Sequence, residues 1–311
     1  MVSTWLNGLV SGTVIIPAAY FAGGEIGASV AATVNKLAFS DDSRTTLGTG
    51  LAAARYGLAG AANSGVAAYF AGGIGADWST KTDAIDKLAF SDDSRTTLGT
   101  GLSAARNELG GAANSGTAAY WAGGYEASGM VSTVDKTAFS DDGRSTLSTG
   151  LSVTTRGLAG LANSGTAAYF GGMSGTVDVN KFAFSDDSRT TLAAGLSSER
   201  YYTGAAANSG VAGYWAGGTT YSGGTTVDKF AFSDDSRTTL GTGLSTQTRG
   251  LAGAAQSGTA AYFAGGHLDS PPERTDKIEK FAFSDDSRSV LSTVLSAATY
   301  LLAGAANSGT L

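Results

Sequence analysis

Short apolar runs separated by clusters of turn residues fill the chain and recur in the same order. Between residues 58 and 102 the runs are 58–65 (LAGAANSG), 67–73 (AAYFAGG), 84–90 (AIDKLAF) and 96–102 (TTLGTGL). Each has about the length of a strand, and the joints carry Asn-Ser-Gly, Gly-Gly or Ser-Asp-Asp-Ser, which favour turns. No window keeps a helical period with caps. The pattern therefore predicts four short antiparallel strands, named a, b, c and d here.

This four-run unit occurs six times. The phrase FSDD marks the turn between c and d, and successive copies lie 51, 49, 45, 48 and 51 residues apart. A period near 50 residues with four strands per copy is typical of propeller blades. The sequence therefore predicts an all-β, six-bladed β-propeller that forms one domain over residues 14–311.

The two ends of the chain suggest how such a ring closes. Residues 1–13 match the repeat poorly, so we expect an N-terminal extension or a degenerate strand a. Residues 300–311 (YLLAGAANSGTL) follow the sixth strand d and have the sequence of one more strand a. We expect this strand to complete the first blade, which leaves no open sheet edge. The alternative is a fragment of a longer protein with seven blades.

Residue sizes fit that architecture. Strand a contains almost only glycine and alanine, as in LAGAA at 58–62, and strand b carries a Tyr-Phe or Tyr-Trp pair. Six inner strands that converge on an axis leave no room for bulky side chains. Neighbouring side chains of strand b point to opposite faces, and both faces can be apolar because each blade is covered by its neighbours.

The repeat resembles a known family. An arginine, a small strand, a turn, an aromatic strand with Gly-Gly and a strand with a V-D-K-F core resemble the kelch repeat over about residues 14–311. Strand d departs from that family because leucine, as at Leu98, replaces the usual tryptophan. The c–d turn also resembles the Asp-box hairpin, which Ser91, Asp93 and Thr97 match. Such glycine-rich arrays are similar to those of bacteriophage tail-associated structural proteins, which implies a virion or tail component.

Composition narrows the chemistry. The chain has no cysteine, one histidine and a net charge of −6, so thiolate metal sites and disulfides are impossible and general nucleic-acid binding is disfavoured. No run of 18 apolar residues exists, which predicts no membrane insertion. We expect no cofactor, no metal site and no enzymatic activity. A basic leader is missing, and we expect a virion or extracellular location, with a cytoplasmic one left open.

Charged residues recur at two places. The twelve aspartates of the FSDD turns predict either a calcium ring or hairpin turns whose aspartates bond local backbone, with a nearby arginine; the second reading is favoured. A possible anion-binding ring precedes strand a, with the alternative that each arginine pairs with a local acid such as Glu108 or Glu199. Its members are Arg55, Arg106, Arg156, Arg200 and Arg249.

The copies differ most in the loop between strands b and c. Exposed aromatic residues on such loops favour a binding surface on a rigid scaffold. The predicted contact residues are Trp78, Lys81, Tyr125, Met130, Tyr221, His267 and Arg274. We therefore predict a non-enzymatic binding or structural module that engages a protein partner in a larger assembly or a cell-surface glycan. The alternatives are a glycan-active enzyme with an Arg-lined site and a freestanding secreted or intracellular adaptor.

Overall fold

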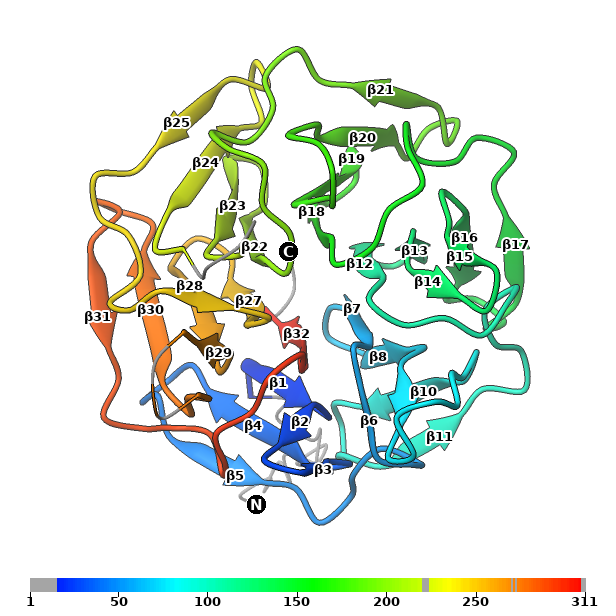
Figure 1. The fold of residues 1–311 in the computed structure, drawn as a ribbon, viewed down its shortest axis with the longest axis horizontal. Coiled ribbons are helices and arrows are strands. Elements are labelled where there is room, and N and C mark those ends of the chain that lie inside the picture. The colour runs from blue at the N-terminus through cyan, green and yellow to red at the C-terminus, as the bar shows by residue number, and fades with distance from the viewer. Residues whose placement is uncertain (1–15, 220–223, 270, 272, 309–311) are drawn as a thin grey trace, which may run out of the picture.

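Six four-stranded antiparallel sheets stand around a central axis like the blades of a propeller (Figure 1). The computed structural model describes residues 16–219, 224–269, 271 and 273–308, and every regular element within them is a β-strand. In each blade, strand a lies at the axis and strand d at the rim. The predicted six-bladed propeller is confirmed. Residues 1–13 lie outside the described part of the chain.

Each blade consists of one strand a, b, c and d, given below in order from blade 1 to blade 6. Strands a are β32 (Ala303–Asn307), β7 (Ala59–Asn63), β12 (Gly110–Asn114), β18 (Ala159–Asn163), β22 (Gly204–Asn208) and β27 (Ala252–Gln256). Strands b are β1 (Ala18–Ala22), β8 (Ala67–Ala71), β13 (Ala118–Ala122), β19 (Ala167–Gly171), β23 (Ala212–Ala216) and β28 (Ala260–Ala264). Strands c are β4 (Val34–Ala38), β10 (Ile85–Ala89), β16 (Val134–Ala138), β20 (Asn180–Ala183), β24 (Val227–Ala231) and β30 (Ile278–Ala282). Strands d are β5 (Arg44–Thr46), β11 (Arg95–Thr97), β17 (Arg144–Thr146), β21 (Arg189–Thr191), β25 (Arg237–Thr239) and β31 (Arg288–Val290).

Short two-stranded ribbons lie at one end of the ring. They pair β2 (Glu25–Ile26) with β3 (Ser29–Val30), β6 (Arg55–Tyr56) with β9 (Ile74–Gly75), β14 (Tyr125–Glu126) with β15 (Gly129–Met130), and β26 (Thr248–Arg249) with β29 (His267–Leu268). Strand d is shorter than the sequence predicted, with three residues instead of about seven. A short rim strand limits the open edge that each blade presents to solvent.

The last described strand closes the ring, as predicted. β32 pairs antiparallel with β1, from Ala18↔Asn307 to Ala22↔Ala303. The first blade therefore takes its strand a from residues about 280 positions away, since the sheet order is β32-β1-β4-β5. This seam gives blade 1 the same four strands as the other five blades.

Glycine at the second position of strand a, present in every blade but blade 5, sets how closely the inner strands approach one another. A Cβ built on Gly60 would lie 2.2 Å from the carbonyl oxygen of Gly304, and one on Gly253 would lie 2.1 Å from that of Ala205. Gly111, Gly160 and Gly304 meet backbone oxygens of the preceding blade at 2.2–2.5 Å in the same way. The predicted steric reason for small residues in strand a is therefore confirmed.

We expect Gly253→Ala to lower the free energy of unfolding by about 1–3 kcal/mol, because the new methyl group overlaps neighbouring backbone and forces the strands apart. Gly99→Ala is the matched control, since an added Cβ there meets nothing within 4 Å. Urea unfolding followed by tryptophan fluorescence measures both variants. Equal stability of the two variants would contradict the steric role of Gly253.

Strand b supplies the bulk between the blades. Its aromatic pairs, such as Tyr120 and Trp121, are 0–1% exposed in every blade and point to opposite faces. Local substitutions compensate each other. Where the chain replaces phenylalanine by Trp121, it places Thr137 at a position that is leucine or phenylalanine in other copies, and the indole N–H donates to Thr137 Oγ1 at 3.0 Å. The buried indole is thereby satisfied.

A recurring contact, which we call the blade latch, joins each blade to the next. At the junction of blades 3 and 4, the Tyr120 hydroxyl donates to Asp187 Oδ1 at 2.6 Å, and Lys136 Nζ lies 2.8 Å from Asp187 Oδ2. Tyr120 also packs against Phe184 with ring centroids 5.2 Å apart. The same tyrosine, lysine and aspartate meet at all six junctions, where the aspartates are Asp93, Asp142, Asp187, Asp235, Asp286 and Asp42.

The two aspartates in each FSDD turn make different contacts. The first bonds local backbone, as Asp186 Oδ1 does with the amide of Ser188 at 3.0 Å, which confirms the predicted hairpin turn. The second, as at Asp187, has φ near +57° and reaches the preceding blade. The expectation that a nearby arginine pairs with the turn aspartates is wrong. Arg95 instead lies 3.7 Å from Asp86 on strand c.

Alkaline pH tests the latches. Burial, together with the nearby carboxylate, raises the pKa of all six latch tyrosines, and that of Tyr169 rises from 10.0 to about 12. The folded state therefore holds these protons more tightly than the unfolded state does. We expect a stabilisation that is complete below pH 10 and is lost as the pH rises toward 12. The pH dependence of urea unfolding measures it, and Tyr169→Phe should weaken the dependence. A flat profile above pH 10 would contradict the prediction.

Candidate functional site: the b–c loop face

The b–c loops and the d–a loops lie at the same end of the ring, because the strands of each blade alternate in direction. We call this end the b–c loop face. The opposite end carries the a–b turns and the FSDD turns. The sequence varies among blades on the b–c loop face and is nearly constant on the other, so this face is where the six blades acquire different chemistry.

Trp78 stands on a turn that is fixed from within. The amide of Trp78 donates to the carbonyl of Gly75, and the Asp77 carboxylate accepts from the amides and hydroxyls of Ser79 and Thr80. These hydrogen bonds, those from Thr80 first, lower the pKa of Asp77, so that it stays ionised. Trp78 has φ of +60°, which is rare for a bulky residue, and its side chain is 44% exposed. The indole packs against Tyr56, with ring centroids 5.0 Å apart, and the rest of its surface is exposed.

Tyr125 forms a second exposed aromatic position on the neighbouring blade. Lys81 Nζ lies 4.8 Å and Arg156 Cζ 5.1 Å from the centroid of its ring, so two cations hold the ring in place. Tyr125 is 37% exposed, and Met130, its partner in the β14–β15 ribbon, is 43% exposed. Trp78, Tyr125 and Met130 are referred to below as the aromatic patch, which spans blades 2 and 3.

A groove of about 450 Å³ adjoins the turn that carries Trp78. Its walls are the d–a loop that leads into blade 2 and the b–c loop of the same blade. Alanine methyl groups dominate the lining, which consists of Ala52, Ala53, Ala54, Arg55, Gly75, Ala76, Asp77, Thr80, Thr82 and Ala84. This groove was not predicted from the sequence. One signal is present in hindsight: the position of Ala52 is serine in the other five blades.

The five arginines before strand a occupy two different positions, which corrects the expectation that they are equivalent. The carbonyls of Arg55 and Arg106 accept from Gly24 and Gly73, and at the same place in blade 4 the carbonyl of Thr155 accepts from Gly124. Arg156 is thus one residue later than Arg55, and so is Arg249.

Three of the five arginines, Arg55, Arg106 and Arg200, are buried in ion pairs inside their own blades. Arg106 is 0% exposed and its Nη2 lies 3.0 Å from Asp135 Oδ2. Arg55 pairs with Asp86 at 2.9 Å and Arg200 with Asp228 at 2.8 Å in the same way. Burial alone would raise the pKa of Asp135, but hydrogen bonds from Thr146 and Ser103 and the charge of Arg106 outweigh it and lower that pKa. A ligand cannot reach these three guanidiniums.

Arg156 and Arg249 instead lie near the mouth of the axial channel. Arg156 Nε is 3.5 Å from Glu108 Oε2, the local acid named from the sequence, and the Tyr202 hydroxyl donates to the same oxygen at 2.7 Å. Arg249 Nη1 is 3.6 Å from Asp269. Burial, and then the charge of Glu108, raises the pKa of Tyr202. The mouth thus carries paired charges.

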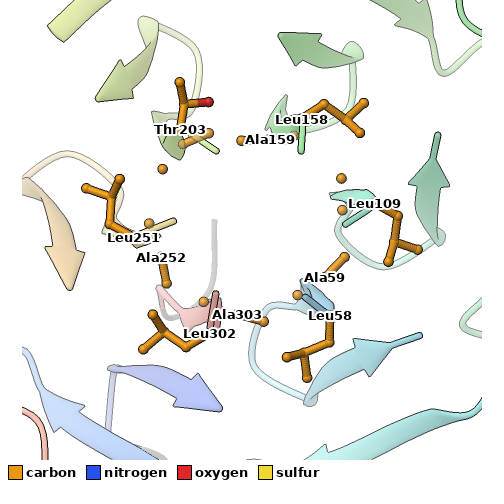
Figure 2. A pocket seen from close by; sticks show the side chains of 18 residues that line it. Leu58, Ala59, Leu109, Leu158, Ala159, Thr203, Leu251, Ala252, Leu302 and Ala303 are labelled. Atoms are coloured by element: carbon orange, nitrogen blue, oxygen red, sulfur yellow. The ribbon is translucent and has the colours of Figure 1, made fainter. Parts of the chain in front are cut away.

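Backbone hydrogen bonds form a closed circle around the axis at this mouth. Each of six residues donates its amide to the carbonyl of its neighbour around the axis at 2.6–2.9 Å, in the closed circle Gly57, Leu301, Gly250, Tyr202, Gly157 and Glu108. Behind the circle lies an axial cavity of about 90 Å³ (Figure 2). Its leucines, such as Leu58 and Leu158, point away from the axis into the spaces between blades, so backbone and alanine line the cavity.

The other predicted contact residues lie apart from the aromatic patch. His267 is paired with Arg249 in the ribbon of blade 6, and its ring lies 5.4 Å from that of Tyr300. Burial and the charge of Arg249 lower the pKa of His267. Arg274 forms an ion pair with Glu25 of blade 1. Tyr221 lies outside the described residues. The structure therefore brings together Lys81, Tyr125 and Met130, carries Trp78 on the same loop as Lys81, and places His267 and Arg274 at the junction of blades 6 and 1.

These features define the class of the fold, a closed six-bladed β-propeller with one variable face. No family model matches the chain, and no curated protein matches its sequence. The likeness to kelch repeats accordingly stays a resemblance of residues. Within the described residues, no cluster of three or more His, Cys, Asp or Glu side chains is arranged to hold a metal ion. No helix in that part of the chain has the length and apolar character needed to cross a membrane.

Proposed function

We propose that the protein is a binding and structural module that holds its partner on the b–c loop face, over blades 2 and 3. The observation that carries this proposal is Trp78, an exposed indole fixed on a preformed turn with its φ at +60°. Strained residues and exposed aromatic side chains concentrate at functional sites. An indole that is already ordered loses little conformational entropy when a partner covers it.

The scaffold supports this role. Blade latches tie all six junctions, and the closing strand ties the ends of the ring. The titratable groups with displaced pKa values include the latch tyrosines and the buried arginine–aspartate pairs, and both kinds hold blades in shape. A rigid body with variable loops is a common way to present binding residues.

The proposal extends to the setting of the protein. The resemblance to glycine-rich repeat arrays of phage tail proteins favours a virion or tail component. Its partner would then be another protein of the same assembly or a glycan on a host surface. The location that follows is the virion or the extracellular space.

We expect Trp78→Ala to weaken partner binding at least tenfold, about 1.4 kcal/mol or more, and Tyr125→Ala to weaken it less. The full chain is screened against a glycan array and against purified proteins of the candidate assembly, and affinities are measured by calorimetry. Val66→Ala is the control, because this residue is 52% exposed in the a–b turn of the same blade, on the opposite face. A partner whose affinity is unchanged by both aromatic variants would overturn the proposed face.

A further inference from the structure

The groove on blade 2 is apolar by sequence and not only by shape. Alanine occupies Ala52, Ala53 and Ala54 on one wall and Ala76 and Ala84 on the other. In the other blades a serine stands at the place of Ala52, and in blades 3, 5 and 6 its hydroxyl donates to the strand c carboxylate. Blade 2 lacks this hydroxyl, and Asp86 is bonded there by the Ala52 amide at 2.9 Å. The groove therefore offers methyl groups where its counterparts offer a polar group.

Its charged and hydroxyl groups are already engaged, except that the buried Nε of Arg55 has no hydrogen-bond partner among the described residues. Arg55 is bound to Asp86 and to the carbonyl of Phe70. Asp77 accepts four hydrogen bonds from its own turn. The Thr80 hydroxyl donates to Asp77, and the Thr82 hydroxyl accepts from the Ala84 amide. A sugar needs polar side chains that can receive its hydroxyl groups, and this lining spares few. Apolar side chains fit it better.

A cation stands on the other side of the same loop. Lys81 lies between the two threonines of the lining and extends over the ring of Tyr125 on blade 3. Among the described residues, no carboxylate lies within ion-pair distance of Lys81. Asp83 turns elsewhere, since its side chain lies against Gly101. A ligand that runs from the groove to Tyr125 thus meets apolar surface first and an unneutralised ammonium group second.

We propose that this strip binds an extended segment of a partner protein, with an apolar side chain in the groove and a carboxylate at Lys81. This inference rests on the proposed function and names its ligand class. Trp78 belongs to the loop that carries both contacts, packs against Tyr56 with ring centroids 5.0 Å apart, and would meet the segment with its exposed surface. The charge pair sets orientation, and burial in the groove supplies most of the affinity.

A random 12-residue peptide library displayed on phage, panned against the full chain, provides the probe. We expect enriched peptides to share an apolar residue followed or preceded within a few positions by aspartate or glutamate. Ala53→Asp places a charge in the groove and should weaken synthetic copies of these peptides at least tenfold. The matched control, Ala105→Asp, changes an exposed alanine in the corresponding loop of blade 3 and should alter binding less than twofold.

Charge reversal tests the second contact. Lys81→Glu should weaken the acidic peptides at least fivefold and should strengthen copies in which the acid is replaced by lysine. Enriched peptides that ignore both Ala53→Asp and Lys81→Glu would overturn the inference, and so would a library that yields no such peptides.

The two proposals fail in different ways. Glycan ligands, or peptides that depend on Trp78 and Tyr125 but not on Ala53, leave the b–c loop face in place and refute the peptide groove. Ligands that depend on none of these residues refute both.

Discussion

Replacement of Arg106 by methionine lowers the free energy of unfolding by about 3–5 kcal/mol, the usual effect of removing one partner from a buried ion pair. Arg106 and Asp135 are both 0% exposed, and the guanidinium also donates to the carbonyl of Trp121 at 3.2 Å. Without Arg106, the carboxylate of Asp135 stays buried with its neutral donors and with the more distant, partly exposed Arg144, whose Nη1 is 3.9 Å away. Urea unfolding at pH 7 measures the loss.

The chain itself provides the matched control. Blade 4 has Thr155 where blade 3 has Arg106, and Asn180 where it has Asp135. The double variant Arg106→Thr/Asp135→Asn therefore installs a pair that another blade already uses. We expect it to be clearly more stable than Arg106→Met, because no charge remains buried. If the double variant is as unstable as Arg106→Met, the uncompensated charge is not the cause of the loss.

Loss of a blade latch has the second largest expected effect. Asp187→Ala removes the hydrogen-bond acceptor of the Tyr120 hydroxyl and the ion-pair partner of Lys136. Tyr120 is 0% exposed. Hydrogen bonds to charged groups contribute about 1.5–3 kcal/mol, and we expect a loss of that size. Thermal and urea unfolding of the purified variant give the value.

Two neighbouring variants isolate the latch. Asp186→Ala, in the same turn, removes only a local backbone contact and should cost about 0.5 kcal/mol. Asp187→Asn keeps an acceptor for Tyr120 and a side chain that tolerates positive φ, so it should fall between the two. Equal stability of Asp186→Ala and Asp187→Ala would show that the contact between blades contributes little.

Periodicity was enough to predict the fold because each blade is built from local signals. The turn phrases fix where strands end, the Gly-Ala runs fix which strand is innermost, and the extra copy of strand a at 300–311 indicates the closing strand β32. The predicted strand d was too long. In the first copy the strand ends at Thr46, before Gly48 and Gly50. Sequence propensity alone does not show where a rim strand loses its partner.

The latch and the arginine pairs were harder to predict because their partners are far apart in the chain. Tyr120 and Asp187 are 67 positions apart and belong to different blades. A signal was available, since tyrosine, lysine and the second aspartate occur in all six copies. The arginine pairs left a trace as well: Arg55, Arg106 and Arg200 occur with Asp86, Asp135 and Asp228, whereas Thr155 occurs with Asn180. This pairing was not predicted because Arg156, which lies one residue later in its repeat than Arg106, was treated as its equivalent.

The site itself was predicted in part. Variation among b–c loops indicated Trp78, Lys81, Tyr125 and Met130, and the structure places them on neighbouring blades. The alanine groove could not be anticipated, because its two walls come from loops about 25 residues apart whose small residues carry no individual signal. Nor could the fixed turn under Trp78, which depends on four hydrogen bonds to one carboxylate.

The seam between β1 and β32 also determines how the molecule responds to mechanical load. Ala18 and Asn307 face each other in the first pair of that seam. A force that pulls these two residues apart therefore peels the pairing open one residue pair at a time instead of shearing all pairs at once. This seam lies inside blade 1, so the latches, which join different blades, do not reinforce it. A circular permutant with its ends moved to a b–c loop and the seam joined by a linker would withstand a greater pull.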